Sequence, residues 1–367
     1  MFSAEDARYM ARALKLARRG LYTTDPNPRV GCVLVGNGKV LGEGWHERAG
    51  GPHAEIVALN QSGQQHLYGA TAYITLEPCC HTGRTGPCSQ ALIDAGVARV
   101  VVAMRDPNPC VDGGGIKQLQ DAGIEVHHGL MEAQAETLNP GFISRMTRHR
   151  PWLRVKLAAS LDGRTALKNG ESKWITGEDA RADVQMLRAR SSAILTGVST
   201  VLHDNPSLNV RDLDIGRQPL RVVTDTGLRM PTDAAMLKLP GQTLIATAVR
   251  NPEKEEVLRA AGAEIVHIGT QAHAIDLPAL MTHLAAREVN EMHVEAGATL
   301  CGALLQAGLV DELVLYLAPH ILGNQSRGLF NLPELETMSG RIELTITDVR
   351  AVGRDWRVTA RVGSGPR

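Results

Sequence analysis

Three residues in the N-terminal half of the chain have the types and spacing that bind a catalytic metal ion. His53 begins the tripeptide His-Ala-Glu, Cys79 follows Pro78, and Cys88 lies nine positions after Cys79. Catalytic zinc needs three protein ligands and one open position, and a neutral imidazole with two thiolates suits this ion. We therefore predict one zinc ion per chain, held by His53, Cys79 and Cys88.

Glu55 is the residue predicted to move protons at this metal. It follows His53 by two positions, so its carboxylate can face the open metal position without being a ligand. Zinc lowers the pKa of a bound water to about 7, and a nearby carboxylate can take that proton and deliver it to departing ammonia. The predicted chemistry is hydrolytic deamination of an amino-substituted nitrogen heterocycle.

The full set of these residues indicates a catalytic zinc site more specifically than the H-x-E spacing does by itself. The H-x-E spacing recurs at His293 and Glu295, with only Cys301 nearby and no Pro-Cys partner. In contrast, H-A-E followed by P-C and a further Cys matches the zinc-deaminase signature, although its usual C-x-x-C spacing is widened here.

Two alternatives to a catalytic zinc remain open from the residues alone. One is a set of buried free thiols, and the other is a closed structural zinc site with Cys80 or His81 as a fourth ligand. Neither explains Glu55. Cys80 neighbours Cys79 on an extended or turning backbone, so its side chain should point away from the metal.

Alternating helix and strand signals surround these residues and predict a layered α/β sheet. Ser3 can cap a first helix, and the pair Asn37-Gly38 predicts a tight hairpin turn between VGCVLV and KVLGEGW. Helices HAEIVALNQ, CSQALIDAG and GIKQLQDAG then alternate with strands TAYITLEP, VARVVVA and IEVHHG. The metal residues lie at the turns, where two helix N-termini favour thiolate over thiol.

At 367 residues the chain is long enough for two domains. Asn139-Pro140-Gly141 and the basic stretch from Arg145 to Arg150 mark the end of the first unit, and Pro151 marks the start of the second. The second half alternates in the same way and ends in a pair of strands. We place the domains at 1–147 and 148–367.

Composition and charge oppose nucleic-acid and membrane partners. Lys plus Arg equals Asp plus Glu at 39 each, and aromatic residues make up only 3% of the chain, so a small-molecule substrate is favoured. The sequence shows neither a secretory signal nor an apolar run long enough to span a membrane, which predicts a cytoplasmic protein. Among the six cysteines, the crowding of Cys79, Cys80 and Cys88 favours metal binding over a disulfide framework.

Motifs along nearly the whole chain resemble the bifunctional riboflavin-biosynthesis deaminase/reductase family. These motifs are DPNPRVGCVLV, GPHAEIVAL and TLEPCCHTGRTGPCSQALIDAG, followed by VKLAASLDGRTA, SKWITG, TVLHDNPSLNVR and VEAGATLCGALLQAG. The resemblance implies an α/β protein with a cytidine-deaminase-like α/β/α domain and a C-terminal α/β domain similar to dihydrofolate reductase.

The resemblance also implies two reactions. The first domain would deaminate 2,5-diamino-6-ribosylamino-4(3H)-pyrimidinone 5′-phosphate with zinc, and the second would reduce the ribosyl chain of the product to ribityl with NADPH. Asn27, His46 and Arg84 match positions that contact the pyrimidine or its phosphate. Arg84 stands where some members carry Lys, and Cys80 where many carry Ser.

The residues of the second half say less by themselves. AILTG-VSTV and HVEAG-ATLCGALL could present helix N-termini to the phosphates of a dinucleotide, but neither is G-x-G-x-x-G. The resemblance assigns NADPH contacts to Ala158, Trp174, Thr200, Asp204, Thr226, Gly297, Ala298, Thr299, Leu300, Cys301, Gly302 and Ala303. It assigns reductase-substrate contacts to Ser172, Arg188, Leu208, Arg211 and Glu295, and Lys156 and Asp162 are weaker candidates for proton delivery.

Two rival functions remain in view. A nucleic-acid deaminase of the transfer-RNA type would share the zinc signature, but it would need a basic, aromatic-bearing surface and would leave the second half unexplained. A zinc-stabilised binding module without enzymatic activity would not need Glu55. The sequence leaves the oligomeric state unresolved, with a homo-oligomer possible.

Overall fold

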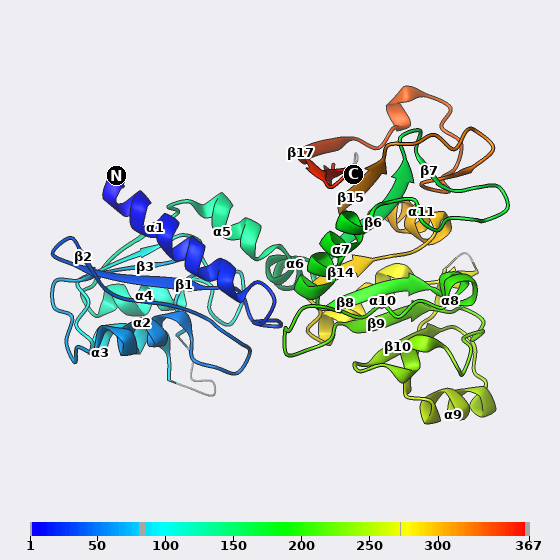
Figure 1. Ribbon diagram of the computed structural model, residues 1–367. Coiled ribbons are helices and arrows are strands. Elements are labelled where there is room, and N and C mark those ends of the chain that lie inside the picture. The colour runs from blue at the N-terminus through cyan, green and yellow to red at the C-terminus, as the bar shows by residue number, and fades with distance from the viewer. Residues whose placement is uncertain (1, 81–85, 272, 364–367) are drawn as a thin grey trace. The chain divides into compact units, whose positions relative to one another are not determined.

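The computed structural model describes residues 2–80, 86–271 and 273–363, which form two compact units divided between residues 149 and 150 (Figure 1). Each unit contains a sheet with helices packed against it. Among the described residues, no helix is both long and apolar enough to cross a membrane.

The first unit contains a five-stranded sheet in the order β2-β1-β3-β4-β5, in which β1 pairs antiparallel with β2 and β3, whereas β3, β4 and β5 are parallel. Its elements in chain order are α1 Ala4–Ala17, η1 Arg18–Gly20, β1 Gly31–Gly36, β2 Lys39–Trp45, α2 Ala54–Ser62, β3 Thr71–Ile74, α3 Cys88–Asp94, β4 Arg99–Val102, α4 Gly114–Asp121, β5 Glu125–His128, α5 Glu132–Leu138 and α6 Pro140–Arg148.

Local sequence signals explain how several of these elements begin and end. The Ser3 side chain accepts from the Asp6 backbone N–H while the Asp6 carboxylate accepts from the Ser3 N–H, which is the reciprocal cap expected at a helix start. Asn37 and Gly38 both have positive φ, at 50° and 72°, as a type I′ hairpin turn requires. The expected start of the first helix and the expected hairpin are therefore confirmed.

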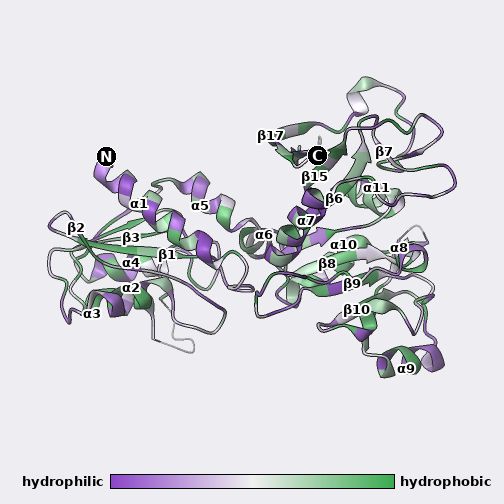
Figure 2. Ribbon diagram, viewed as in Figure 1, coloured by the Kyte–Doolittle hydropathy of each residue, from purple (hydrophilic) through white to green (hydrophobic). Residues whose placement is uncertain are grey.

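Alternating side chains of the strands separate two apolar cores in this unit. Val33 and Val35 pack with α1, α5 and α6, whereas Cys32 and Leu34 pack with α2, α3 and α4. Figure 2 shows the strands of this unit mostly green and α1 largely purple. This alternation produces the expected α/β/α layering.

The second unit contains a nine-stranded sheet in the order β11-β10-β9-β8-β14-β6-β15-β18-β17. Its elements are β6 Trp152–Ser160, β7 Arg164–Ala166, α7 Glu178–Arg190, β8 Ala193–Gly197, α8 Val198–Asp204, β9 Leu220–Thr224, η2 Ala235–Lys238, β10 Thr243–Thr247, α9 Pro252–Ala260, β11 Ala263–His267, β12 Thr270–Gln271, β13 Ala274–Ile275, α10 Leu277–Ala286, β14 Glu291–Val294, α11 Ala298–Gln306, β15 Val310–Ala318, β16 Arg327–Gly328, η3 Met338–Gly340, β17 Leu344–Val352 and β18 Asp355–Val362.

Seven neighbouring strands of this sheet, from β11 to β15, are parallel, and the hairpin of β17 and β18 completes it in antiparallel orientation. Residues of α10 and α11 pack on one face, and residues of α8 and α9 pack on the other. Parallel sheets covered on both faces place ligand sites at the carboxyl ends of their strands. The carboxyl ends of β6, β8, β9 and β14 therefore frame the candidate site of this unit.

Candidate metal centre and reductase site

Helix starts position the three predicted metal ligands of the first unit. His53 is the N-cap residue of α2, Cys88 is the first residue of α3, and Cys79 lies in the segment that follows β3. Neither helix has a side-chain cap, so the partial positive charge of its first turn is directed to the sulfur and nitrogen atoms nearby.

The three side chains converge closely enough to share one ion. Nδ1 of His53 lies 3.2 Å from Sγ of Cys88 and 3.6 Å from Sγ of Cys79, and the three donor atoms all lie within 4.8 Å of one another. The backbone N–H of Cys88 also points at Sγ of Cys79, at 3.4 Å. One nitrogen and two sulfurs at these separations fit zinc.

The thiols of Cys79 and Cys88 differ in acidity. A hydrogen bond from Cys88, supported by His53, lowers the pKa of Cys79, whereas the same hydrogen bond and burial raise the pKa of Cys88. Cys79 is therefore the more acidic thiol of the pair. A divalent cation would favour deprotonation of the second sulfur as well.

Glu55 lies in the first turn of α2 beside the ligands and has a free carboxylate oxygen. The residue is only 3% exposed, and its Oε2 has no hydrogen-bond partner. Burial raises the pKa of Glu55 to about 7, and a cation next to it would oppose that rise. A buried polar atom without a partner is costly. The position of this oxygen fits a carboxylate that would receive a proton from a water molecule bound to the metal.

His46 and Asn27 form a polar pair next to the metal ligands. The ring of His46 lies edge-on to that of His53, with centroids 5.5 Å apart, and Nε2 of His46 is 3.1 Å from Nδ2 of Asn27. Nδ1 of His46 is 3.0 Å from the carbonyl oxygen of Pro52. Since burial lowers the pKa of His46, its neutral ring donates to Pro52 and accepts from Asn27.

Cys80 lies apart from the three ligands. Its Sγ packs against the start of α4, where a Cβ added at Gly114 would lie 2.8 Å from it. Among the described residues, the group that could hold a metal consists of His53, Cys79 and Cys88. His81 and Arg84 lie outside the described residues.

A buried carboxylate that was not predicted from the sequence lies close to Cys79 along the chain. Glu77 is 3% exposed and accepts hydrogen bonds from the backbone N–H groups of Asp106, Gly113, Gly115 and Ile116. Its signal in the sequence is a charged residue directly after the apolar run that contains β3, two positions before Cys79.

The predicted reductase residues gather at the carboxyl ends of the parallel strands. Ala158 lies near the end of β6, Thr200 and Asp204 lie in α8 after β8, Thr226 follows β9, and Glu295 follows β14. A Cβ added at Gly197 would lie 3.6 Å from Thr224 and 3.7 Å from Leu300, so the ends of β8 and β9 meet the first turn of α11.

A charged group at this edge joins α7 to β14. Arg188 forms two hydrogen bonds with Glu295 and donates a third, of 3.0 Å, to the carbonyl oxygen of Asn209, next to Leu208. Burial opposes ionisation of Glu295, but Arg188 and His293 outweigh it and hold its pKa well below the usual value. Burial lowers the pKa of Lys156 on the neighbouring strand.

The remaining predicted residues of this unit are more exposed. Trp174 is 69% exposed, and the guanidinium of Arg181 lies 4.7 Å from its ring centroid. Lys173 is 3.9 Å from Asp204, and the backbone N–H of Arg211 donates to Gln185 of α7 at 3.0 Å. Ser172 is partly buried, and Asp162 is held in a turn by the N–H groups of Leu322 and Gly323.

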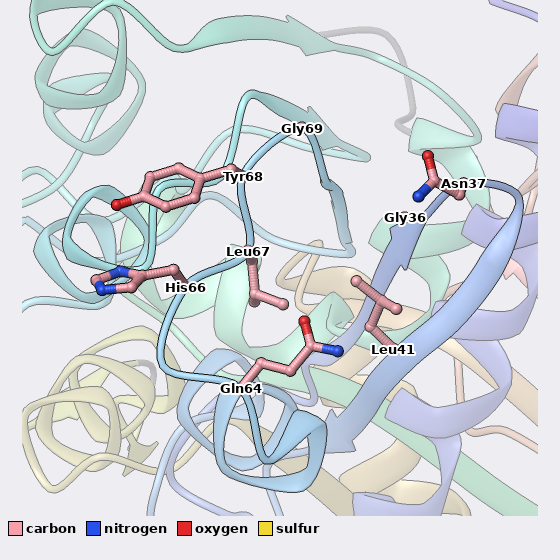
Figure 3. A pocket seen from close by; sticks show the side chains of 8 residues that line it. All are labelled: Gly36, Asn37, Leu41, Gln64, His66, Leu67, Tyr68 and Gly69. Carbon is pink, nitrogen blue, oxygen red and sulfur yellow. The ribbon is translucent and has the colours of Figure 1, made fainter.

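A shallow pocket of about 200 Å³ lies elsewhere in the first unit, between the turn of the β1–β2 hairpin and the segment before β3 (Figure 3). His66 stacks on Tyr68 at its rim, with ring centroids 5.1 Å apart. None of the three metal ligands lines this pocket, so it is separate from the metal centre.

An α/β/α unit with one imidazole, two thiols and a buried glutamate at its helix starts defines a zinc-binding deaminase domain, joined here to a second α/β unit. Residues 3–104 match the family model of the cytidine and deoxycytidylate deaminase zinc-binding region, and residues 151–358 match the RibD C-terminal domain. The chain belongs to the RibD family, whose members are bifunctional deaminase/reductase enzymes of riboflavin biosynthesis.

Similar proteins span the full length of the chain. The riboflavin biosynthesis protein RibD of Escherichia coli is 50% identical over 364 residues, covering 96% of this chain and 98% of that protein. The Haemophilus influenzae protein of the same name is 46% identical, covering 98% of each.

Solved structures confirm the fold of both units. RibD from Acinetobacter baumannii superposes with a TM-score of 0.90 at 44% identity, covering 98% of this chain and 99% of that one. A diaminohydroxyphosphoribosylaminopyrimidine deaminase/5-amino-6-(5-phosphoribosylamino)uracil reductase from Thermotoga maritima has a TM-score of 0.86 at 31% identity, covering 98% and 99%. The expected cytidine-deaminase-like and dihydrofolate-reductase-like folds are therefore confirmed.

Proposed function

We propose that residues 1–147 deaminate 2,5-diamino-6-ribosylamino-4(3H)-pyrimidinone 5′-phosphate and that residues 148–367 reduce the ribosyl chain of the aminouracil product with NADPH. The printed name of the Thermotoga maritima relative supports this substrate pair. The observation that carries the deaminase half is the convergence of His53, Cys79 and Cys88 next to a buried carboxylate with an unpartnered oxygen.

His53, Cys79 and Cys88 would hold zinc in this proposal, and Glu55 would be the proton carrier. Bound zinc would supply Lewis acidity, which makes water acidic enough to ionise near neutral pH. Glu55 accepts a proton from the attacking water and passes it to the amino group that leaves as ammonia. Its burial supports this role, because burial raises the pKa of the carboxyl and makes it a better proton acceptor, while the adjacent cation would oppose part of that rise.

Asn27, His46 and Arg84 would recognise the substrate of the deaminase. The neutral His46 ring fixes the orientation of the Asn27 amide, whose remaining donor and carbonyl oxygen suit the edge of a pyrimidine. Arg84 would contact the phosphate, for which a guanidinium has the right charge and geometry.

The cofactor of the second unit would be NADPH, which supplies the hydride. Gly297 is the N-cap residue of α11 and carries no side-chain cap, and a Cβ there would meet no atom within 4 Å. The backbone N–H groups of the first turn of α11, from Ala298 to Leu300, are therefore suited to phosphate, whereas that of Cys301 already donates to the carbonyl oxygen of Gly297. The other proposed cofactor contacts are Ala158, Trp174, Thr200, Asp204 and Thr226.

The reductase substrate would bind beside this cofactor, among Ser172, Arg188, Leu208, Arg211 and Glu295. Arg188 already holds both Glu295 and the backbone next to Leu208, so it would set the shape of the sugar site. The exposed Arg211 supplies a free guanidinium for the substrate phosphate. Lys156 is the proposed source of the proton that accompanies hydride transfer, because burial holds its pKa below the ordinary value for lysine.

A coupled assay with metal analysis on the same preparation tests this division. We expect about one zinc per chain, release of ammonia from the diaminopyrimidine phosphate, and NADPH consumption only after ammonia release. Removal of zinc with a chelator should stop ammonia release yet leave reduction of supplied aminouracil phosphate intact. Loss of both activities in chelated, folded protein would contradict two separate sites.

The proposed partners are small phosphoribosyl pyrimidines and not nucleic acids, which the equal numbers of basic and acidic residues support. We also propose a cytoplasmic location, where metal-binding thiols stay reduced.

We further propose a homo-oligomer. The edge strand β17 carries Ile346 at 62% exposure, and Trp356 on β18 is 52% exposed. An unpaired apolar edge favours association with a second copy. Sedimentation of the wild type and of Ile346→Lys would test this, because a monomeric wild type contradicts it.

A further inference from the structure

We propose that Glu77 is a positioning residue of the metal centre, which fixes the Pro78–Cys79 segment to the start of α4. This inference rests on the proposed zinc site and goes beyond it, because the Glu77 carboxylate bonds to backbone N–H groups and not to the ligand atoms. It acts through the backbone that carries Cys79.

The hydrogen bonds of Glu77 use both carboxylate oxygens. Oε1 accepts from the N–H groups of Gly115 at 3.0 Å and Ile116 at 3.1 Å. Oε2 accepts from Gly113 at 3.1 Å and Asp106 at 3.2 Å. All these donors are backbone groups from a segment 29 to 39 residues further along the chain.

The donors include the N–H groups that a helix start leaves without partners. Gly113 is the N-cap residue of α4, and no residue of the helix supplies a side-chain cap. Glu77 therefore caps α4 from the segment that follows β3, and its negative charge lies at the positive end of the helix. The cap and the metal ligand are separated by a single residue, Pro78.

The backbones of the two segments also touch directly. A Cβ added at Gly115 would lie 1.9 Å from the carbonyl oxygen of Pro78, so only glycine permits this approach. The N–H of Glu77 donates to the carbonyl oxygen of Met104 at 3.0 Å, which holds the other side of the segment. The two residues before Cys79 thus have little freedom, and they hold Cys79 in place before any metal binds.

Preorganised ligands bind metal more tightly than ligands that must first be ordered, and loss of an outer partner typically weakens metal binding by about 10- to 100-fold. Glu77→Gln should produce such a loss. Whichever way the amide turns, its NH₂ group faces two backbone N–H donors, so one side of the cap breaks.

The test compares full-length wild type with Glu77→Gln, Glu77→Asp and Asp6→Asn, using Zn²⁺ in competition with a chromophoric chelator. Asp6 is the matched control, since it is another buried carboxylate of the same unit with several donors, but it lies on α1, whose core is on the other face of the sheet. We expect a zinc dissociation constant about 10- to 100-fold higher for Glu77→Gln, a smaller rise for Glu77→Asp, and no rise for Asp6→Asn.

The absorption of the Co²⁺-loaded proteins supplies a readout that general destabilisation would not move. The thiolate-to-cobalt bands should weaken or shift in the Glu77 variants and stay unchanged in Asp6→Asn. If Glu77→Gln does not fold, Glu77→Asp decides the question, because it keeps the charge and both acceptor oxygens.

Folded Glu77 variants with wild-type zinc affinity and wild-type cobalt spectra would overturn the inference. An equal loss of zinc affinity in Asp6→Asn would also overturn it, because the effect would then follow from stability alone. A wild-type protein that binds no zinc would instead refute the proposed function itself.

Discussion

Arg188 holds the Glu295 carboxylate with two hydrogen bonds, from Nε to Oε1 at 2.5 Å and from Nη2 to Oε2 at 3.0 Å. Both side chains are mostly buried, with 11% and 15% exposure. A two-point contact of this kind fixes direction as well as distance. Since Arg188 also binds the carbonyl oxygen of Asn209, the pair joins α7, the end of β14 and the segment of Leu208.

Glu295→Gln should lower the reductase kcat/KM by about 10- to 100-fold, because it removes one charge-assisted hydrogen bond from this buried pair. Deamination should be unchanged. The measurement is NADPH oxidation with supplied aminouracil phosphate, alongside ammonia release from the same protein.

Glu264→Gln is a suitable control for this variant. Glu264 also forms a two-point pair, with Arg287, but it is 50% exposed and far along the sheet on β11. Exposed pairs contribute little, so reduction should stay within about twofold of wild type. Equal losses in both variants would remove Glu295 from the sugar site.

Glu55→Gln should lower ammonia release by a factor of about 10² to 10⁴, which is the usual contribution of a general acid–base group. Zinc content should remain near one per chain, because Glu55 is not one of the three converging donors. Steady-state ammonia release and metal analysis measure the two properties. Full deaminase activity in a zinc-loaded variant would assign proton transfer to another group.

The group of His53, Cys79 and Cys88 and the helices beside it were predictable from the sequence because their signals are local. His53 and Glu55 lie within three residues, Pro78-Cys79 comes shortly after the apolar run that forms β3, and Ser3 and Asn37-Gly38 mark a helix start and a turn. Each signal depends on residues a few positions apart, which propensity and spacing describe well.

Contacts between segments far apart in the chain could not be predicted from the sequence. The cap that Glu77 places on α4 joins segments about thirty or more positions apart, and an acidic residue alone does not name its donors. Arg154, at 1% exposure, pairs with Glu291 and Glu312 across three strands. A fully buried arginine within an apolar strand is not expected from hydropathy, and only the register of β6, β14 and β15 explains it.

Asp6→Asn should lower the free energy of unfolding of the first unit by about 1 to 2 kcal/mol near pH 7. Asp6 accepts from Arg99 at 2.7 Å and from Tyr73 at 2.8 Å. The Arg99 hydrogen bond holds the pKa of Asp6 well below its ordinary value of 3.8.

The pH dependence of this effect has a definite sign. A carboxyl whose pKa is lower in the folded state stabilises the fold above its unfolded pKa and loses that contribution as the pH falls. The difference between wild type and Asp6→Asn should therefore be full at pH 6 and shrink below about pH 4. Urea unfolding at several pH values measures it, and a difference that grows toward acid pH would refute the assignment.

Gly302→Ala should weaken the cofactor site of the second unit. A Cβ at Gly302 would lie 2.1 Å from the carbonyl oxygen of Asn331. Asn331 in turn holds the first turn of α11, because its backbone N–H donates to Ala298 at 3.0 Å and its Nδ2 donates to Thr299 at 2.9 Å. Alanine in a helix is favoured over glycine by up to about 1 kcal/mol, but this overlap costs about 1 to 3 kcal/mol. The clash should therefore prevail, displace the segment of Asn331 and raise the KM for NADPH several-fold while leaving ammonia release unchanged.

Gly269→Ala is the control, since a Cβ there would meet no atom within 4 Å, and it should leave the KM unaltered. A wild-type KM in folded Gly302→Ala would show that the first turn of α11 does not depend on this contact to bind the cofactor.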